Sequence, residues 1–532
     1  MERPHYIVVG AGSSGAVLAN RLSASPGTSV VLLEAGRRPD HALIRMPKGF
    51  AKLTGRPDMA WHYTTEAQAH RGRGPELWPR GKTLGGSSAI NGMIYIRGQA
   101  ADYEAWEALG NPGWGWGEML RCFRAMEDFR GPASDAHGKG GPLAVTPGHF
   151  RYDLADRIID AGVQAGLPRT TDFNSGDQEG VGYYDHTIRD GRRESSAAAF
   201  LKPIKARPNL RIVQNALVDR IIVEDGRAVG VSARIDGEPV ELRCTGEVVV
   251  AAGALQSPKL LQLSGIGSGA LLQHLGIPIV RDCAAVGQHM LEHVGMAVNF
   301  RIRVPGNNRL LRGVGLAGSV LQYGLARRGI LSTGPFEVGA FGRSRPEVDR
   351  PDFQLFLAPI SMAPVGPGTY VGGVEKLPGL TAAAYNVRPT SEGHVTITSP
   401  DPDAPLRIQP NSLASAEDRS TAIGMMKFVR HMMAMPALRE VVGPETEATA
   451  SAQSDEELER LLNVNARCGN HATGTCRMGP GQDAVLDPQL RVRGIEGLRV
   501  ADLSSMPIIP SGNTNAPAMA LGWRAAEIIL KG

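Results

Sequence analysis

A glycine-rich turn between an apolar strand and a helix, close to the N-terminus, limits the folds open to this chain more than any other feature. Residues 6–9 are apolar or aromatic, and the turn after them has the spacing G-x-G-x-x-G at Gly10, Gly12 and Gly15. A run with helical character follows, and residues 29–33 form a second apolar strand. A βαβ unit of about thirty residues builds parallel sheet. We therefore predict that the chain begins with a doubly wound α/β domain.

The same turn has the residues that a dinucleotide pyrophosphate needs. The first glycine allows the sharp turn, the second lets the backbone approach the phosphates, and the third lets the helix pack on the strand. Glu34 ends the second strand, where a carboxylate accepts hydrogen bonds from ribose hydroxyls. This acid disfavours NADP, which carries a 2′-phosphate. The motif does not separate NAD from FAD.

Two further glycine-rich segments bear on that choice. Residues 81–92 read G-K-T-L-G-G-S-S-A-I-N-G, and consecutive small residues leave backbone amides free for phosphate or a flat ring system. On spacing alone, an ordinary glycine-rich turn is the simpler interpretation. Residues 248–267 comprise an apolar strand, a small-residue turn and a helix that ends on glycine.

Together the three segments resemble the glucose–methanol–choline (GMC) family of FAD-dependent oxidoreductases, in the branch of choline dehydrogenases and alcohol oxidases. The resemblance is dense over the first hundred residues, over 248–267 and from 470 to the C-terminus. It implies an α/β fold, α+β overall, in which a Rossmann-like FAD-binding domain joins a discontinuous substrate domain built on an antiparallel sheet flanked by helices. We expect the FAD-binding domain to take residues 1–150, 200–293 and 455–532, and the substrate-binding domain residues 151–199 and 294–454.

The chain between these motifs gives a coarser pattern. Turn signals and alternating segments predict hairpins between residues 210 and 252, and residues 394–398 alternate like a half-exposed strand. Three segments have helical periodicity. These expected helices are 417–433, 455–463 and 516–530.

The resemblance also places a catalytic pair near the C-terminus. His471 lies in C-G-N-H-A-T-G-T-C, and Asn513 lies in P-S-G-N-T-N. By resemblance, His471 takes the hydroxyl proton of an alcohol, which an imidazole with an ordinary pKa of about 6.5 can do near neutrality. Asn513 would then stabilise the charge on oxygen while hydride passes to flavin N5. Zinc at Cys468, His471 and Cys476 would have only three ligands, so we assign no metal site.

Other cofactor contacts carry over from the family by position. Ile90 stands where some members attach FAD to a histidine, so we expect non-covalent FAD. The expected cofactor-binding residues are Gly10, Gly12, Ser13, Ser14, Gly15, Glu34, Ala35, Gly85, Ser88, Asn91, Gly92, Val218, Ala252, Asp502, Asn513 and Thr514.

Substrate residues lie outside the motifs, and an aromatic residue or methionine at such positions is more often part of a core. Glu337 could hold a cationic head group or form a surface ion pair. Because only 5% of the residues are aromatic, no cage for a quaternary amine is evident, and we favour a neutral primary alcohol over choline. The expected substrate contacts are Tyr63, Met93, Tyr95, Phe336, Glu337, Phe356 and Asn470.

Composition excludes several other classes. A net charge of +4 over 532 residues, without a basic block, argues against nucleic-acid partners. No apolar stretch approaches the ~18 residues of a membrane span, and five scattered cysteines do not suggest a disulfide framework.

We predict a cytoplasmic enzyme, with peripheral membrane association left open, and an acceptor that is oxygen or a quinone or cytochrome. The alternatives are a hydroxynitrile lyase that keeps FAD without redox turnover, a choline dehydrogenase, an NAD-dependent dehydrogenase and a non-catalytic flavoprotein.

Overall fold

The first of two cores is a parallel sheet that begins at the N-terminal strand. The structure is a computed structural model that describes residues 3–38, 41–148, 150–363 and 372–531. The sheet has the order β11–β2–β1–β15–β26, all parallel. Its inner strands consist mainly of buried valine, leucine and isoleucine, as expected where both faces are covered. The strands are β1 (Tyr6–Val9), β2 (Val30–Leu33), β11 (Leu210–Val213), β15 (Glu247–Val250) and β26 (Leu498–Val500).

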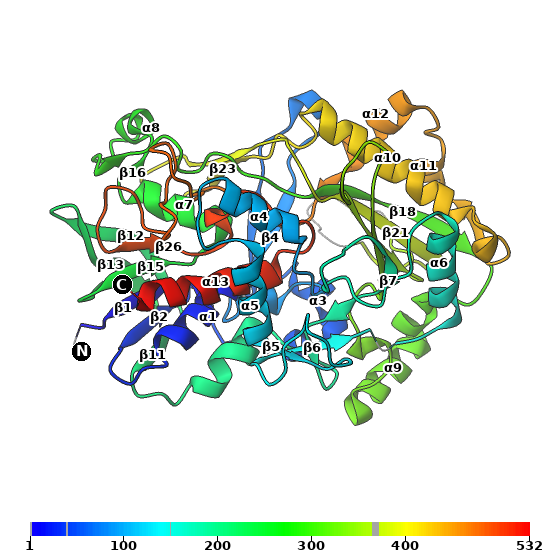
Figure 1. The fold of residues 1–532 in the computed structure, drawn as a ribbon, viewed down its shortest axis with the longest axis horizontal. Helices are drawn as coiled ribbons and strands as arrows, with labels where there is room; N and C mark the ends of the chain where they lie inside the picture. Colours follow the sequence, from blue (N-terminus) through cyan, green and yellow to red (C-terminus); the bar gives the residue numbers. More distant parts are fainter. Residues whose placement is uncertain (1–2, 39–40, 149, 364–371, 532) are drawn as a thin grey trace.

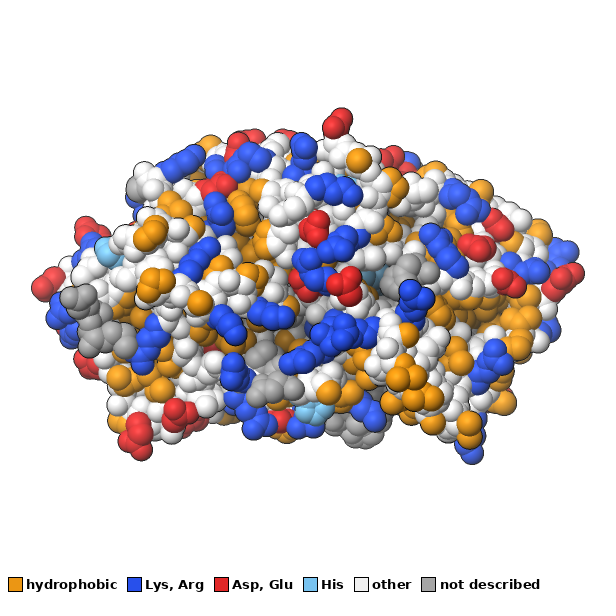
Figure 2. Space-filling view, turned by 90° about the horizontal axis from the view of Figure 1, so that it is seen from below, with side chains coloured by type: hydrophobic (Ala, Val, Ile, Leu, Met, Phe, Trp, Pro, Cys, Tyr) orange, Lys and Arg blue, Asp and Glu red, His pale blue; other side chains and the backbone are white. Residues whose placement is uncertain are grey.

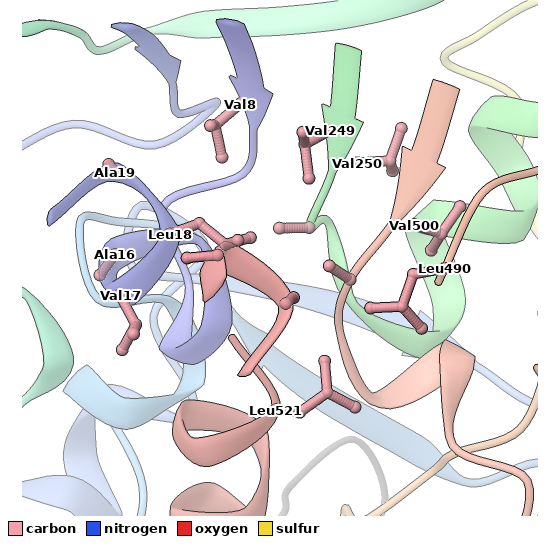
Figure 3. Close-up of a cluster of buried hydrophobic side chains, with 14 of the residues drawn as sticks. Val8, Ala16, Val17, Leu18, Ala19, Val249, Val250, Leu490, Val500 and Leu521 are labelled. Carbon is pink, nitrogen blue, oxygen red and sulfur yellow. The ribbon is translucent and has the colours of Figure 1, made fainter. Parts of the chain in front are cut away.

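Helices α1 (Ser13–Leu22) and α13 (Asn515–Leu530) pack together against this sheet, although they come from opposite ends of the chain. Figure 3 shows the resulting cluster, in which Val8, Val249 and Val500 of the strands meet Leu18 and Leu521 of the two helices. The C-terminal helix therefore completes the core that the first strand begins. Flanking elements are α4 (Ala100–Ala108), α5 (Trp116–Met126), and the antiparallel β12 (Ala216–Glu224), β13 (Arg227–Ile235) and β14 (Glu238–Arg243).

The second core is an antiparallel sheet, on the right in Figure 1. Its order is β24–β18–β21–β20–β19–β7, and β25 pairs with β18. Helices α6 (Asp153–Gln164), α10 (Ala416–Met433) and α12 (Asp455–Asn465) pack on it. The strands are β7 (Gly180–Tyr183), β18 (Val294–Ile302), β19 (Val338–Gly342), β20 (Phe353–Ala358), β21 (Gly379–Asn386), β24 (Val442–Glu445) and β25 (Arg467–Cys468).

The predicted fold class is confirmed, with one parallel and one antiparallel core. The three expected helices correspond to α10, α12 and α13, and the expected hairpins to β12–β13–β14. The domain boundaries stay a prediction, and two contacts cross them. Strand β25 joins the antiparallel sheet, and the hairpin of β22 (His394–Ile397) and β23 (Leu406–Gln409) packs on α7 (Gly253–Leu263).

Candidate active site

A cavity of 680 Å³ lies between the two cores. At one end it is lined by the carboxyl ends of β1, β2 and β15 and by the start of α1. At the other end it reaches the face of the antiparallel sheet, where Phe356 and Tyr385 line it. The hairpin of β3 (Ala60–Thr64) and β4 (Leu77–Gly81) adds a further wall. The cavity thus joins the expected nucleotide end to the expected catalytic end.

Each glycine of the G-x-G-x-x-G turn has a different steric reason to be there. A Cβ on Gly10, whose φ is +98°, would lie 2.5 Å from the carbonyl oxygen of Ala251, and one on Gly15 would lie 1.8 Å from that of Gly10. A Cβ on Gly12 would meet nothing within 4 Å, because Gly12 faces the cavity. No side chain caps the N-terminus of α1, so its first amides remain free for an anionic group such as a pyrophosphate.

Glu34 lies at the end of β2 in the cavity wall, with both carboxylate oxygens held by backbone amides. Oε2 accepts from the Ala11 N–H at 3.0 Å, and Oε1 accepts from the Gly36 N–H at 2.8 Å. Burial raises the pKa of Glu34 to about 7, and the two amides oppose this shift. A carboxylate with lone pairs to spare fits the hydroxyls of a ribose. Ala35 and Val218 line the cavity beside it.

The second glycine-rich segment, residues 81–92, packs against the G-x-G-x-x-G turn on the side away from the cavity. The Gly85 N–H donates to the Ala11 carbonyl at 2.8 Å, and the Ser88 hydroxyl donates to the Gly85 carbonyl at 2.5 Å. A Cβ on Gly86 would lie 2.8 Å from the Cα of Gly12. Gly15, Gly85 and Ser88, expected to contact the cofactor, therefore lie behind the lining, whereas Gly86 belongs to it.

Asp502 follows β26 and also lines the cavity, but its carboxylate is occupied by protein groups. It accepts from the Gly253 N–H at 2.8 Å, the Ser257 hydroxyl at 2.5 Å and the Ser504 N–H at 2.8 Å. Its main effect is thus to hold the turn before α7 against the turn after β26. The expected cofactor residues that line the cavity are Gly10, Gly12, Ser13, Ser14, Glu34, Ala35, Asn91, Gly92, Val218, Ala252, Asp502, Asn513 and Thr514.

His471 and Asn513 meet at the catalytic end of the cavity. The Nδ2 of Asn513 lies 3.4 Å from the Nε2 of His471. Gln354, on β20, donates from its own Nε2 to the Oδ1 of Asn513 at 3.0 Å. Because that oxygen is already an acceptor, the amino group of Asn513 is the part that faces the histidine.

The protonation of His471 follows from a second histidine, His293. The Nε2 of His293 lies 3.2 Å from the Val387 carbonyl, which can only accept, so this nitrogen carries a proton. Burial and His471 keep the pKa of His293 well below its usual value, so the ring is neutral and its Nδ1 carries no proton. That nitrogen lies 3.0 Å from the Nδ1 of His471, which must therefore donate. The Nε2 of His471 is left without a proton, beside Asn513.

Burial and the nearby Arg80 keep His471 neutral. Burial, followed by the charge of Arg80, lowers the pKa of His471 to about 3. Glu292 accepts from the backbone N–H of His471 at 2.6 Å, and its other oxygen lies 3.7 Å from Arg80. Burial raises the pKa of Glu292 to about 7, with Arg80 opposing the shift. The imidazole is thus a base held in its neutral form.

Five of the seven expected substrate residues line the cavity, and two do not. Tyr95 is fully buried and donates to Glu127, which forms an ion pair with Arg97 at 2.6 Å, so Tyr95 belongs to a buried charge network. Glu337 is 5% exposed, and burial raises the pKa of its carboxyl group. The positive charge of the nearby Lys48 opposes that rise. The five that line the cavity are Tyr63, Met93, Phe336, Phe356 and Asn470.

Sequence reasoning missed several residues at the catalytic end. His293 and Gln354 lie 178 and 159 residues from their partners, and no local spacing signals such contacts. Arg80 stands directly before the glycine-rich segment and could have been singled out as a cation beside a motif; its side chain is half-buried. Its guanidinium donates to the Oδ1 of Asn470, a cavity residue with a φ of +64°.

Comparisons with known proteins agree with this geometry. Residues 5–295 match the N-terminal domain and residues 389–522 the C-terminal domain of GMC oxidoreductases. An alcohol dehydrogenase (acceptor) of Pseudomonas putida is 39% identical, with 99% of this chain and 95% of the relative covered. An oxygen-dependent choline dehydrogenase of Rhizobium johnstonii is 38% identical over the same shares of the two chains.

Solved structures show the same architecture. A pyridoxine 4-oxidase from Mesorbium loti superposes with a TM-score of 0.88 at 30% identity, over 98% of each chain. A formate oxidase variant of Aspergillus oryzae RIB40, studied for FAD modification, gives a TM-score of 0.91 at 26% identity, over 99% of this chain and 98% of that one.

A dinucleotide-binding core joined to a cavity that ends at a neutral histidine and an amide defines a dinucleotide-dependent oxidoreductase. The chain belongs to the GMC oxidoreductase family, because the matched domains and the relatives cover nearly all of it. FAD is accordingly its cofactor, and the open lining at Gly12, the uncapped helix α1 and the carboxylate of Glu34 fit that group.

Proposed function

We propose that this protein uses non-covalently bound FAD to oxidise a neutral primary alcohol to the aldehyde. The observation that carries the proposal is the bare Nε2 of His471, which faces the amino group of Asn513 at the end of the cofactor cavity. An unprotonated nitrogen beside an N–H donor is what the hydroxyl group of an alcohol needs, since that group must lose its proton while its oxygen gains charge.

The residues of the chain divide this work between them. His471 takes the hydroxyl proton at Nε2, and the Nδ2 of Asn513 donates to the oxygen that becomes negative. Gln354 keeps the Asn513 amide in that orientation, and His293 keeps the proton of His471 on Nδ1. Bound FAD supplies the acceptor for the hydride that leaves the same carbon. Loss of one proton and one hydride from a primary alcohol gives the aldehyde.

The charges around the catalytic end support a neutral substrate. Arg80 lines the cavity there, and its positive charge would repel a quaternary ammonium group. Within the described part of the chain, the acids that line the cavity are Glu34, Asp403 and Asp502. Glu34 and Asp502 lie at the expected nucleotide end, and Asp403 pairs with Arg234 at 2.7 Å. Choline is the second candidate because of the 38% identical choline dehydrogenase.

The absence of a covalent link is proposed from the side chain at the expected attachment position. Ile90 is buried, lines the cavity and has no group that could bond to the flavin. Precipitation of the holoenzyme with trichloroacetic acid should leave all of the yellow colour in the supernatant. Colour that stays in the pellet would contradict non-covalent binding.

The experiment that tests the function compares His471→Ala with His274→Ala, a variant of an exposed histidine. Under anaerobic conditions a panel of primary alcohols and choline is added to each holoenzyme, and loss of the flavin absorption near 450 nm is followed. We expect bleaching in the wild type and in His274→Ala, and a rate reduced by about 10²–10⁴ in His471→Ala with FAD still bound. Bleaching at the wild-type rate in His471→Ala would exclude this residue as the base.

Further additions to the same bleached sample distinguish the possible electron acceptors and the alternative functions. Return of the colour when air is admitted identifies oxygen as the acceptor, whereas return only with a quinone or a cytochrome identifies a dehydrogenase. A yellow enzyme that cleaves a hydroxynitrile without bleaching would instead indicate a lyase. Faster bleaching by choline than by any neutral alcohol would favour choline as the substrate.

A further inference from the structure

Helix α9 (Gly313–Ala326) presents an apolar surface to solvent. Val314 is 92% exposed, Leu321 63% and Leu325 81%. Their spacing of seven and eleven residues places them on one face of a helix with 3.6 residues per turn. We call these three side chains the apolar stripe. In Figure 1 the helix projects from the lower right edge of the molecule.

The helix is attached to the protein through Ser319 and Tyr323, which lie on the side opposite the apolar stripe. The hydroxyl of Ser319, which is buried, donates to the Leu310 carbonyl at 2.9 Å. Tyr323, one turn later, donates to the Arg45 carbonyl at 3.4 Å. A surface helix of a globular protein normally turns its apolar face inward and its polar face to water. Helix α9 instead exposes its apolar side chains, Leu316 and Val320 included, which indicates that it meets an apolar partner.

The charge around the apolar stripe identifies the chemistry of that partner. From Arg303 to Phe336 the chain has five arginines and no aspartate or glutamate. Arg309, Arg312, Arg327 and Arg328, at the two ends of α9, are exposed, and in the described part of the chain none of them forms an ion pair. Figure 2, a view from below, shows hydrophobic side chains gathered toward the lower right, with basic side chains around them. An apolar face with a basic rim is complementary to an anionic lipid surface.

We propose that α9 docks this protein on the surface of an anionic lipid bilayer, with the apolar stripe among the acyl chains and the arginines at the head groups. The helix has 14 residues, about 21 Å at 1.5 Å per residue, which is too short for a hydrocarbon core of about 30 Å. Among the described residues, no helix has the length and apolar character to cross a bilayer. The association is therefore peripheral.

The docked surface lies next to the substrate end of the cavity. The chain runs from α9 through the short helix η7 (Ile330–Ser332) to Pro335 and Phe336, which line the cavity. Ile330 and Leu331 are buried in a cluster that includes Tyr323 of α9. Docking would thus bring this cavity wall close to the lipid, where an apolar alcohol accumulates. This last step rests on the proposed function, whereas the docking itself does not.

Flotation of the holoenzyme with vesicles tests the docking. Vesicles of phosphatidylcholine with 30% phosphatidylglycerol are compared with vesicles of phosphatidylcholine alone, in a buffer of about 0.1 M salt. We expect the wild type to float with the anionic vesicles and at least tenfold less with the neutral ones. The triple variant Val314→Ser, Leu321→Ser, Leu325→Ser should lose at least tenfold in vesicle binding. A control triple, Leu109→Ser, Val163→Ser, Val464→Ser, removes exposed apolar side chains elsewhere and should float as the wild type does.

A second pair of variants tests the charges. Arg309→Glu with Arg328→Glu should reduce binding to anionic vesicles more than tenfold, whereas Arg407→Glu with Arg460→Glu, an equal charge change elsewhere, should not. All variants should keep the wild-type rate with a water-soluble alcohol, so failure of docking and failure of catalysis are told apart. If the wild type does not float, or is a dimer that the α9 triple converts to a monomer, the lipid proposal is overturned.

Discussion

His293 and His471 meet edge to face, with their rings at 82° and their Nδ1 atoms 3.0 Å apart. Only one of these nitrogens can carry the proton, and the Val387 carbonyl on the far side of His293 decides which. A residue that we place outside the reacting atoms therefore determines which nitrogen of the base is free. The order of donors and acceptors runs from Val387 through both imidazoles to the amide of Asn513 and on to Gln354.

Replacement of His293 should lower activity without loss of cofactor. In His293→Ala the Nδ1–H of His471 has no acceptor, so the proton can move to Nε2 and block the base. We expect kcat/KM to fall about 10–100-fold, the effect typical of removing a group that orients a reactive residue. His293→Asn offers an oxygen at a similar place and should recover part of the loss. A fall in FAD content and thermal midpoint, without rescue by His293→Asn, would mean that the role is structural.

The pH profile of kcat/KM should depend on Arg80. His471 works in its neutral form, so the rate falls as the pH drops through its pKa. Burial and Arg80 lower that pKa to about 3, and in Arg80→Met only burial remains as the cause. The pKa then rises and the acid limb of the profile moves to higher pH. The control Arg407→Met, at an exposed position, should leave the limb where it is. A limb that stays in place or moves to lower pH in Arg80→Met would contradict the assignment.

Two glycines of one motif should respond differently to alanine. In Gly15→Ala the new methyl group would lie 1.8 Å from the Gly10 carbonyl oxygen, so helix α1 must move off β1. We expect destabilisation above the ~1–3 kcal/mol usual for overpacking, seen as aggregation or a much lower thermal midpoint. In Gly12→Ala the methyl group meets no protein atom. That apoprotein should unfold at the wild-type temperature and bind FAD at least tenfold more weakly. Equal thermal midpoints for the two variants would refute this division of roles.

Glu34→Gln should weaken FAD binding. Glutamine has one acceptor oxygen where the carboxylate has two, so either the Ala11 or the Gly36 N–H loses its partner. An unsatisfied buried donor costs about 1–3 kcal/mol, and the ribose also loses a charged acceptor. The expected dissociation constant for FAD, measured by flavin fluorescence on adding cofactor to apoenzyme, is at least tenfold higher. Glu496→Gln, at a side chain that is 80% exposed, serves as the control and should bind FAD normally.

Site residues that lie in short local motifs could be predicted from the sequence, whereas those brought in by long-range packing could not. The turn from Gly10 to Gly15 and the carboxylate of Glu34 are local, so their place at the ends of β1 and β2 could be predicted. Tyr95 was expected near substrate, but the structure places it outside the cavity lining; an aromatic residue beside a motif has no local sign of burial, and its partner Glu127 is 32 residues away. His293 reaches His471 only because β18 pairs with β25, a register that no local pattern specifies.

Strand β25, two residues long, affects how the two cores are linked at the catalytic end of the cavity. It fixes the segment of His471 to the antiparallel sheet, whereas Asn513 stands just ahead of α13, which packs in the parallel core. The backbones of the base and of its amide partner are therefore fixed to different cores, and the hydrogen bond from Gln354 to Asn513 already links the two. An alcohol held between the two side chains adds a further link between the cores, so a saturating unreactive alcohol analogue should raise the thermal midpoint of both together.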